Sequence, residues 1–450
     1  MHDQDPVLVG LTLEVVQHEL TTVKPLSTPA PAAELYAALA GSITDEGIGP
    51  AGAVSLLRDV VGANSMNVSS PNVLAFIPSA ATPASLAADV MLSSMNVIAD
   101  WWLEGAGGIA AENHTLHWLC AQVGLGPHAG GVFVSGATPG NLAGLAAARR
   151  WWRSQHPGHG RERLALVCAQ QAHSSIRMVA GVLDVDVVLA DGDEFGRLRA
   201  PDLEVALAEH RAVGGAPVFA VAATAGTTNL GMVDDLVGLA DVADRESIWL
   251  HVDGAYGGAA VLSAQGRTLL AGLDRVRSMV VDPHKWLFAG YDCCALLYRD
   301  VRIARAAFTQ TAEYLEAVEV SPEEWNPADY AVHLTRRARG VPLWFSLATN
   351  GVQAYRDAVD TCLRTAHEFT AEVEGAPHLR LFAPTTLSIV TFTRDGWERA
   401  DYERWSREQL AAGRFFIAVS EFRGRPLLRV CIVHPKVTIE ALREVIDSLQ

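Results

Sequence analysis

Short apolar runs alternate with helical patterns over about 170 residues in the middle of this chain. The runs expected to form strands are residues 131–134, 164–169, 186–190, 218–224, 248–252, 279–282 and 294–298. Regular strand–helix alternation is typical of a mostly parallel α/β sheet covered by helices. Ligand sites in such sheets lie at the carboxyl ends of the strands. The pattern therefore predicts a fold class and the place where a functional site should be found.

The two flanks of this region have different patterns. Helices are expected at 7–20, 31–40 and 49–61, in a segment too poor in apolar residues to fold alone. After a long helix expected at 343–370, short strands around 387–393 and 427–433 alternate with helices. We therefore predict an N-terminal helical segment (1–82) that packs on the main body or a second subunit, a large α/β domain (83–342) and a smaller C-terminal α+β domain (343–450).

Composition excludes several classes of function. With 35 basic and 51 acidic residues, the chain has a net charge of −16, which repels nucleic-acid phosphates and anionic membranes. Six cysteines without a CxxC pair indicate reduced thiols in a cytoplasm rather than a disulfide scaffold. The first residues lack the basic start of a signal peptide, and no stretch is apolar enough to span a membrane. The pairs His114/His117 and His156/His159 have the spacing of metal ligands but no convincing third ligand nearby, so we expect no metal site.

Lys285 stands in the sequence Asp-Pro-His-Lys-Trp, directly after the strand expected at 279–282. Because burying an ammonium group is costly, a lysine held among such neighbours needs an explanation. One reading is a surface lysine at a strand edge. The other is a lysine that forms a Schiff base, for which a fixed position and a depressed pKa are expected. This stretch alone does not separate the two readings.

Three further features follow expected strands. Thr138 lies in Ser-Gly-Ala-Thr-Pro-Gly, where free N–H groups at a helix start could hold a phosphate. Asp253 ends an apolar strand and needs a partner, which a protonated pyridine nitrogen would provide. His173 could stack on an aromatic ring. Each has an ordinary structural reading when taken alone, but together with Lys285 they fit pyridoxal phosphate.

The motifs that carry these residues resemble those of the pyridoxal-phosphate-dependent group II amino-acid decarboxylases, the family of aromatic-L-amino-acid decarboxylase. The strongest matches are His-Val-Asp-Gly-Ala-Tyr (251–256), Asp-Pro-His-Lys-Trp-Leu (282–287) and Gln-Ala-His-Ser-Ser (171–175). The resemblance implies a fold-type I enzyme with a mostly parallel seven-stranded sheet. It also implies a homodimer with shared active sites and an L-amino-acid substrate.

The resemblance also assigns roles to individual residues. It implies that Lys285 binds the cofactor covalently and that Asp253 pairs with the ring nitrogen. It places His173 and Ala255 on the two ring faces and implies that Tyr314 protonates the substrate carbon. The other residues that it places at the cofactor are Ala137, Thr138, Thr228, Asp282 and His284. The substrate-side residues that we expect are Phe76, Pro78, Ser79, Trp101 and Thr335.

Some positions depart from the family pattern. Asp282 replaces an asparagine that contacts phosphate in some relatives, so this contact is either made by backbone alone or taken over by His284. The apolar residues around Phe76 and Trp101 favour an aromatic or bulky aliphatic substrate, although Trp101 could equally belong to the core. Thr335 should narrow the pocket against indole-sized rings. The alternatives are another reaction on the same cofactor, such as aldehyde formation, another substrate class, and a non-catalytic relative.

Overall fold

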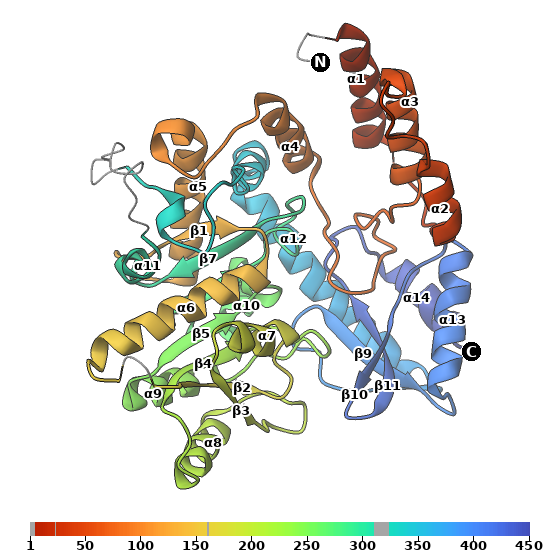
Figure 1. Ribbon diagram of the computed structural model, residues 1–450. Coiled ribbons are helices and arrows are strands. Elements are labelled where there is room, and N and C mark those ends of the chain that lie inside the picture. The colour runs from red at the N-terminus through yellow and green to blue at the C-terminus, as the bar shows by residue number, and fades with distance from the viewer. Residues whose placement is uncertain (1–4, 23, 160–161, 310–323) are drawn as a thin grey trace.

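The computed structural model describes residues 5–22, 24–159, 162–309 and 324–450. Its large sheet has the strand order β1-β7-β6-β5-β4-β2-β3 (Figure 1). The strands are β1 (Gly130–Val134), β2 (Ala165–Ala169), β3 (Asp186–Ala190), β4 (Val218–Thr224), β5 (Trp249–Asp253), β6 (Ser278–Val281) and β7 (Cys294–Tyr298). β7 runs in the opposite direction to the other strands of this sheet, which are parallel to one another. The predicted fold class and all seven expected strands are confirmed.

Apolar runs form these strands because both faces of the sheet are buried. In β7, Ala295 and Leu297 belong to one hydrophobic cluster, whereas Leu296 and Tyr298 belong to the cluster on the opposite face. This alternation follows from the two-residue period of a strand. The sheet is thus a rigid central layer whose strand ends hold their side chains in fixed positions.

Helix α6 (Ala137–Gln155) starts five residues before the expected boundary at 142. The predicted helix began after Pro139. Proline is nevertheless compatible with the first turn of a helix, because the N–H that it lacks has no helical partner there. The earlier start brings Ala137 and Thr138 into the first turn. The loop expected to hold phosphate is therefore partly the end of a helix.

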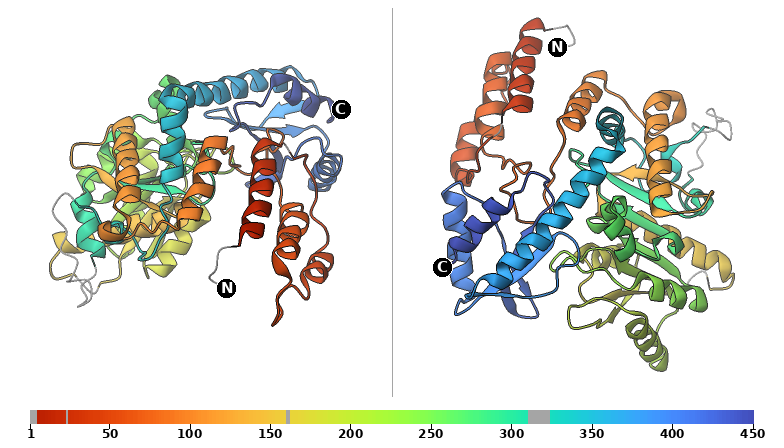
Figure 2. Two further views of the ribbon diagram at one scale, coloured as in Figure 1. Left: turned by 90° about the horizontal axis from the view of Figure 1, so that it is seen from above. Right: turned by 180° about the vertical axis from the view of Figure 1, so that it is seen from behind.

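A second, antiparallel sheet lies toward the C-terminus, with the order β10-β11-β9-β8. Its strands are β8 (Leu379–Leu381), β9 (Ile389–Arg394), β10 (Val419–Phe422) and β11 (Arg425–Cys431). The helices α13 (Arg399–Ala411) and α14 (Ile439–Asp447) accompany it. The long helix α12 (Val341–Gly375) runs from the large sheet to the small one, as the right view of Figure 2 shows. The expectation of a long helix followed by an α+β region is confirmed, although β8 and β10 were missed.

The first three helices form an N-terminal arm that stands clear of both sheets (Figures 1 and 2). They are α1 (Pro6–Thr21), α2 (Ala32–Leu39) and α3 (Gly49–Leu56), and none of them contains a buried residue. The chain then returns to the body, where Leu74 bonds to the backbone of Phe416 and Cys431. In the described part of the chain, no helix is both long and apolar enough to cross a bilayer. The domain boundaries at 82 and 342 remain predictions.

Candidate active site

A cavity of about 260 Å³ opens at the carboxyl ends of the parallel strands. It collects the residues predicted at the cofactor, namely Ala137, Thr138, His173, Thr228, Asp253, Ala255, Asp282, His284 and Lys285. They come from five different connections, each following a strand of the large sheet. The sheet therefore brings together side chains that are far apart in the sequence, as expected at this edge.

Lys285 Nζ lies 2.9 Å from Oδ2 of Asp282, whose side chain is almost fully buried. Burial lowers the pKa of Lys285, but the Asp282 carboxylate, together with Asp253 and Cys294, raises it, so that the net pKa lies above its ordinary value. The expectation of a depressed pKa is therefore wrong for the protein alone. Asp282 was expected beside the phosphate, and its pairing with the lysine three residues later was not predicted.

Both oxygens of the Asp253 carboxylate are held in place. Oδ1 accepts a hydrogen bond from the backbone N–H of Ala255 at 3.1 Å. Oδ2 accepts one from Nδ2 of Asn141 at 2.9 Å. Hydrogen bonds to the charged form stabilise a carboxylate. Asp253 is therefore fixed at the floor of the cavity and is suited to bind a cationic N–H group.

Two histidines line the cavity. The ring of His173 precedes α7 (Ser174–Val182), and its Nδ1 lies 2.8 Å from Oγ of Ser175. His284 Nδ1 lies 2.7 Å from the carbonyl oxygen of Cys293 and 3.3 Å from the backbone nitrogen of the same residue. The Nε2 of His284 is 3.6 Å from the Asp282 carboxylate. Each ring is thus oriented by a hydrogen bond on its Nδ1 side.

The N-terminus of α6 forms one wall of the cavity. The residue before the helix, Gly136, provides no side-chain cap for the first N–H groups. Gly136, Ala137 and Thr138 all line the cavity. Uncapped N–H groups at the start of a long helix, beside a hydroxyl group, suit an anion such as phosphate.

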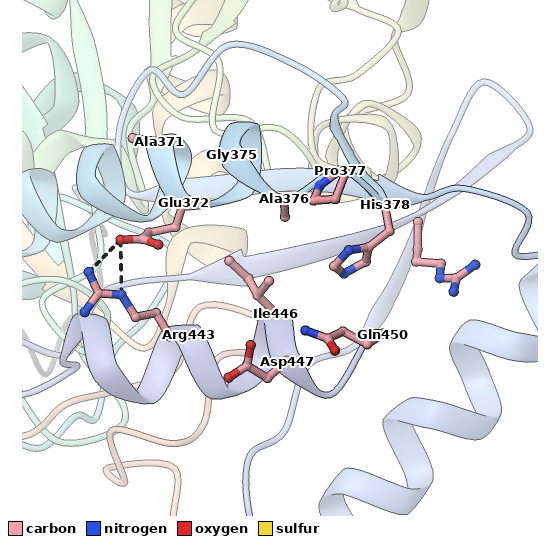
Figure 3. Close-up of a pocket in the computed structure, with 11 residues that line it drawn as sticks. Ala371, Glu372, Gly375, Ala376, Pro377, His378, Arg443, Ile446, Asp447 and Gln450 are labelled. Carbon is pink, nitrogen blue, oxygen red and sulfur yellow. Dashed lines mark hydrogen bonds and ion pairs between the residues drawn. The ribbon is translucent and has the colours of Figure 1, made fainter.

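A larger hollow of about 900 Å³ lies at the C-terminal end of the chain. In Figure 3, Arg443 of α14 pairs with Glu372 of α12 on one side of it, and Gln450 lies on the other. None of the predicted cofactor residues lines this hollow. Because its charged groups neutralise each other at the surface, its volume alone does not make it a catalytic site.

Comparison with known proteins identifies the family. The family described as the pyridoxal-dependent decarboxylase conserved domain matches residues 57–394. The chain belongs to this family. The aromatic-L-amino-acid decarboxylase of Bacillus atrophaeus is 31% identical, with 95% of this chain and 90% of the relative covered. The L-2,4-diaminobutyrate decarboxylase of Rhizobium meliloti is 30% identical, with 90% and 83% covered.

A solved structure of Oryza sativa TDC with PLP and tryptamine has a TM-score of 0.86 to this chain at 25% identity. The match covers 98% of this chain and 95% of that one. The predicted fold, enzyme class and cofactor are thereby confirmed. This decarboxylase family member is a carboxy-lyase that depends on pyridoxal phosphate.

The cavity fits the cofactor of the decarboxylase family. A carboxylate held from both sides would suit a protonated ring nitrogen, the uncapped end of α6 would suit a phosphate, and a lysine at hydrogen-bond distance from Asp282 would suit an aldehyde. Gly226, which also lines the cavity, has a φ of +101° that suits glycine. A Cβ at this position would come within 2.7 Å of Tyr256 Cδ1, so a larger residue would not fit. The region between these groups is the cavity itself, so no described residue fills it.

The residues predicted on the substrate side do not line this cavity. Phe76 is 64% exposed and packs edge-on against Phe416. The Ser79 hydroxyl donates to the carbonyl of Ala289, and Pro78 directly precedes Ser79 in sequence. Trp101 precedes α5 (Trp102–Val123), and Thr335 is exposed. Tyr314, predicted to donate a proton, lies outside the described residues.

Of the apolar residues expected around the substrate, Ile77 lines the cavity and Phe76 beside it does not. Phe76 has a φ of 57°, an uncommon left-handed conformation that no sequence pattern announced. Asn141 bonds to Asp253 but was treated only as part of a turn. Its signal was a polar residue inside an otherwise small and apolar stretch of helix.

Proposed function

We propose that this decarboxylase acts on an L-amino acid with an aromatic or bulky apolar side chain, giving the amine and carbon dioxide. The observation that carries the preference is Ile77, an apolar residue that lines the cavity. The charged residues of the cavity are all assigned to the cofactor in this proposal, so none is left to pair with a charged substrate side chain. An acidic or diamino side chain would require a charged partner. The similarity to an aromatic-L-amino-acid decarboxylase supports the same choice.

Pyridoxal phosphate, when bound, supplies an aldehyde for amine capture and a protonated ring that accepts the electrons released as carbon dioxide leaves. We assign Lys285 to hold it covalently and Asp253 to keep the proton on the ring nitrogen. Oδ2 of Asp282, 2.9 Å from Nζ, holds Lys285 as the ammonium ion in the cofactor-free enzyme. The amine can react with the aldehyde only after its proton has left this pair.

The other residues position the reactants in this proposal. Thr138 and the N–H groups at the start of α6 bind the phosphate, with His284 beside them. His173 and Ala255 hold the two faces of the ring. Tyr314 returns a proton to the substrate Cα after carbon dioxide has left. This division leaves the protein to supply orientation and electrostatics.

An amino-acid panel tests the substrate class. Purified enzyme is incubated with aromatic, aliphatic, acidic and diamino L-amino acids, and carbon dioxide and amine are quantified. We expect the highest kcat/KM for a phenyl or phenol side chain and lower values for tryptophan, because Thr335 is expected to narrow the pocket. Equal turnover of tryptophan, phenylalanine and valine contradicts the proposal. Preferred turnover of glutamate or diaminobutyrate contradicts it too.

Two further measurements separate the alternative functions. Hydrogen peroxide released with an aldehyde would identify the oxidative reaction, whereas amine without peroxide supports decarboxylation. A yellow preparation whose visible absorbance is lost in Lys285→Ala excludes a non-catalytic relative. The Lys436→Ala variant is the matched control, because this lysine lies outside the cavity.

We further propose that the enzyme is a homodimer whose N-terminal arm covers the partner. The helices of the arm bury no residue, and Val9, Leu13, Tyr36 and Ile43 are exposed to 56%, 61%, 77% and 97%. Phe76 and Thr335 lie away from the cavity of their own chain, which is expected if they serve the site of a partner. A cytoplasmic location is proposed on the sequence alone.

A further inference from the structure

A continuous line of buried polar side chains ends on Asp253. It begins at Trp249, whose Nε1 lies 2.8 Å from Oγ of Ser278. That oxygen lies 2.7 Å from Nδ1 of His251, whose Nε2 lies 2.9 Å from Oδ1 of Asn141. Asn141 then reaches Oδ2 of Asp253 at 2.9 Å. All four residues before Asp253 are fully buried, each with 0% exposure.

The protons in this line can point in only one direction. Because Asn141 Nδ2 donates to Asp253, its Oδ1 faces Nε2 of His251 and must accept from it, so that in a neutral imidazole Nδ1 accepts the hydroxyl proton of Ser278, whose oxygen accepts from the indole of Trp249. The proton of His251 is then on Nε2, which donates to the amide oxygen of Asn141. The amide nitrogen is left to face the carboxylate of Asp253. The opposite orientation would place the amide oxygen against that carboxylate, where two acceptors repel.

Burial supports the neutral state of the histidine in this line. It lowers the pKa of His251 to about 4, with Asp253 acting in the opposite direction. A neutral imidazole has one donor and one acceptor, which the arrangement requires. Because every group in the line donates toward Asp253, the bonds polarise one another and strengthen the last one.

The fold around this line is shaped to accommodate it. Residues 249, 251 and 253 point to the same face of β5, and the strand register places His251 beside Ser278 of β6. Gly144 of α6 lies directly over the imidazole, since a Cβ there would come within 2.8 Å of His251 Cε1. The helix can approach the sheet closely enough for Asn141 to join both strand residues.

Asn141 also connects to the histidine at the cavity. Its Nδ2 lies 3.1 Å from Oγ of Ser175, which lies 2.8 Å from Nδ1 of His173. The backbone N–H of Ser175 also donates to this Nδ1, at 3.3 Å. The nitrogen therefore accepts, and the proton of a neutral His173 is on Nε2. A single amide thus serves two groups that line the cavity.

We propose that Asn141, His251 and Ser278 are positioning residues that hold the Asp253 carboxylate toward the cofactor site and set the tautomer of His173. The proposal rests on the function proposed above, in which Asp253 pairs with the ring nitrogen of the cofactor. None of the three residues lines the cavity. They act through Asp253 and His173 and need no contact with substrate.

The test compares Asn141→Leu with Asn326→Leu in the holoenzyme. Asn326 is a matched control, since it is 4% exposed and its amide oxygen accepts the N–H of Trp102 outside the line. For Asn141→Leu we expect the dissociation constant of pyridoxal phosphate to rise about tenfold, the effect of losing one hydrogen bond to a charged group. The pH at which the visible absorbance titrates on the acid side should rise by about one unit.

The control should change neither quantity. If Asn141→Leu and Asn326→Leu give the same dissociation constant and the same titration, the proposal is overturned. At the histidine, His251→Gln retains a neutral donor and should recover part of what His251→Leu loses. Equal losses in these two variants would also contradict the proposal, because packing alone would then explain both.

A double-mutant cycle separates this inference from the proposed function. In an Asp253→Asn background, adding Asn141→Leu should cause no further rise in the dissociation constant. If Asp253→Asn itself leaves decarboxylation intact, the proposed role of Asp253 fails. If Asp253→Asn abolishes activity while the two effects add, only the positioning role fails. Should Asn141→Leu not fold, Ser278→Ala, three hydrogen bonds away from Asp253, is measured in its place with Ser406→Ala as its control.

Discussion

At the scale of single residues, the pair of Lys285 and Asp282 decides how the amine becomes reactive. The separation of 2.9 Å ties the protonation of the lysine to that of one buried carboxylate. A lysine whose pKa is raised contributes stability that is lost as pH rises above its ordinary value of 10.5. Near neutral pH the ion pair is therefore present, and capture of an aldehyde requires that the proton be moved.

The variant Asp282→Asn tests this coupling. Without the carboxylate, burial is opposed by less and the pKa of Lys285 should fall. Cofactor-free enzyme should then capture pyridoxal phosphate faster at neutral pH, with the rate profile displaced toward lower pH. Stopped-flow absorbance across neutral and alkaline pH measures this rate. Asp292→Asn is the control, because Asp292 pairs with Arg339 instead. Identical profiles in wild type and Asp282→Asn would contradict the coupling.

His251 has a second measurable consequence. Its pKa is lowered from 6.5 to about 4 by burial, so the unfolded chain binds a proton in this range that the folded chain does not. The contribution of the neutral histidine to stability is thus lost as pH falls from 6.5 to 4. The stability advantage of wild type over His251→Gln should shrink by roughly 3 kcal/mol over this range. Urea unfolding at several pH values measures it, and a constant difference contradicts it.

At the scale of elements, one buried ion pair fixes the entry to α12. Arg336 forms two hydrogen bonds of 2.7 Å with Glu112 of α5, and the two side chains are 1% and 2% exposed. Glu112 also accepts the N–H of Gly340, just before α12 begins. The pair therefore joins two helices through the segment that precedes the second one.

Breaking this pair should be costly. We expect Glu112→Gln to lower the free energy of unfolding by about 3–5 kcal/mol, because the guanidinium group is left buried without its charge partner. The exposed pair of Glu368 and Arg364 provides the control, and Glu368→Gln should cost less than about 1 kcal/mol. Chemical denaturation of both variants gives the comparison. Similar losses in the two would show that burial does not determine the strength of the first pair.

The sequence predicted the elements better than their contacts. Regular apolar runs located all seven strands of the large sheet, and the strand period already implied that His251 and Asp253 share a face. The contact of Asn141 with Asp253, 112 positions apart, depends on how closely α6 approaches the sheet. That approach depends on Gly140 and Gly144, whose partners no local pattern identifies. The place of Lys285 was predicted from its motif, whereas the direction of its pKa shift required the side-chain geometry.

At the scale of the whole molecule, the exposed N-terminal arm argues for assembly. Apolar residues on helices that bury nothing are expected to be covered by another surface. The arm extends away from both sheets in every view of Figures 1 and 2, so its own chain leaves this surface uncovered. A second copy, offering the same arm in return, would cover two such surfaces at once.

Charges on α1 test the assembly. The double variant Val9→Asp and Leu13→Asp should be monomeric in light scattering and should lose most decarboxylation, since the sites are proposed to be shared. Val213→Asp, on a residue that is 82% exposed at the end of α8 (Ala200–Ala212), should remain a dimer with full activity. Wild type that is already monomeric, or a fully active monomeric variant, would contradict the proposal.

The close approach of α6 to the sheet also limits how this enzyme can evolve. A Cβ at Gly140 would come within 2.7 Å of Val280 Cγ1, and one at Gly144 would meet His251. In a saturation library, these two positions should reject even alanine, while the exposed Arg150 of the same helix should tolerate most residues. Substitutions in this wall of the cavity would disturb the groups that hold the cofactor before they changed which substrate is bound. Lineages that change substrate are therefore expected to accumulate their differences around Ile77 instead.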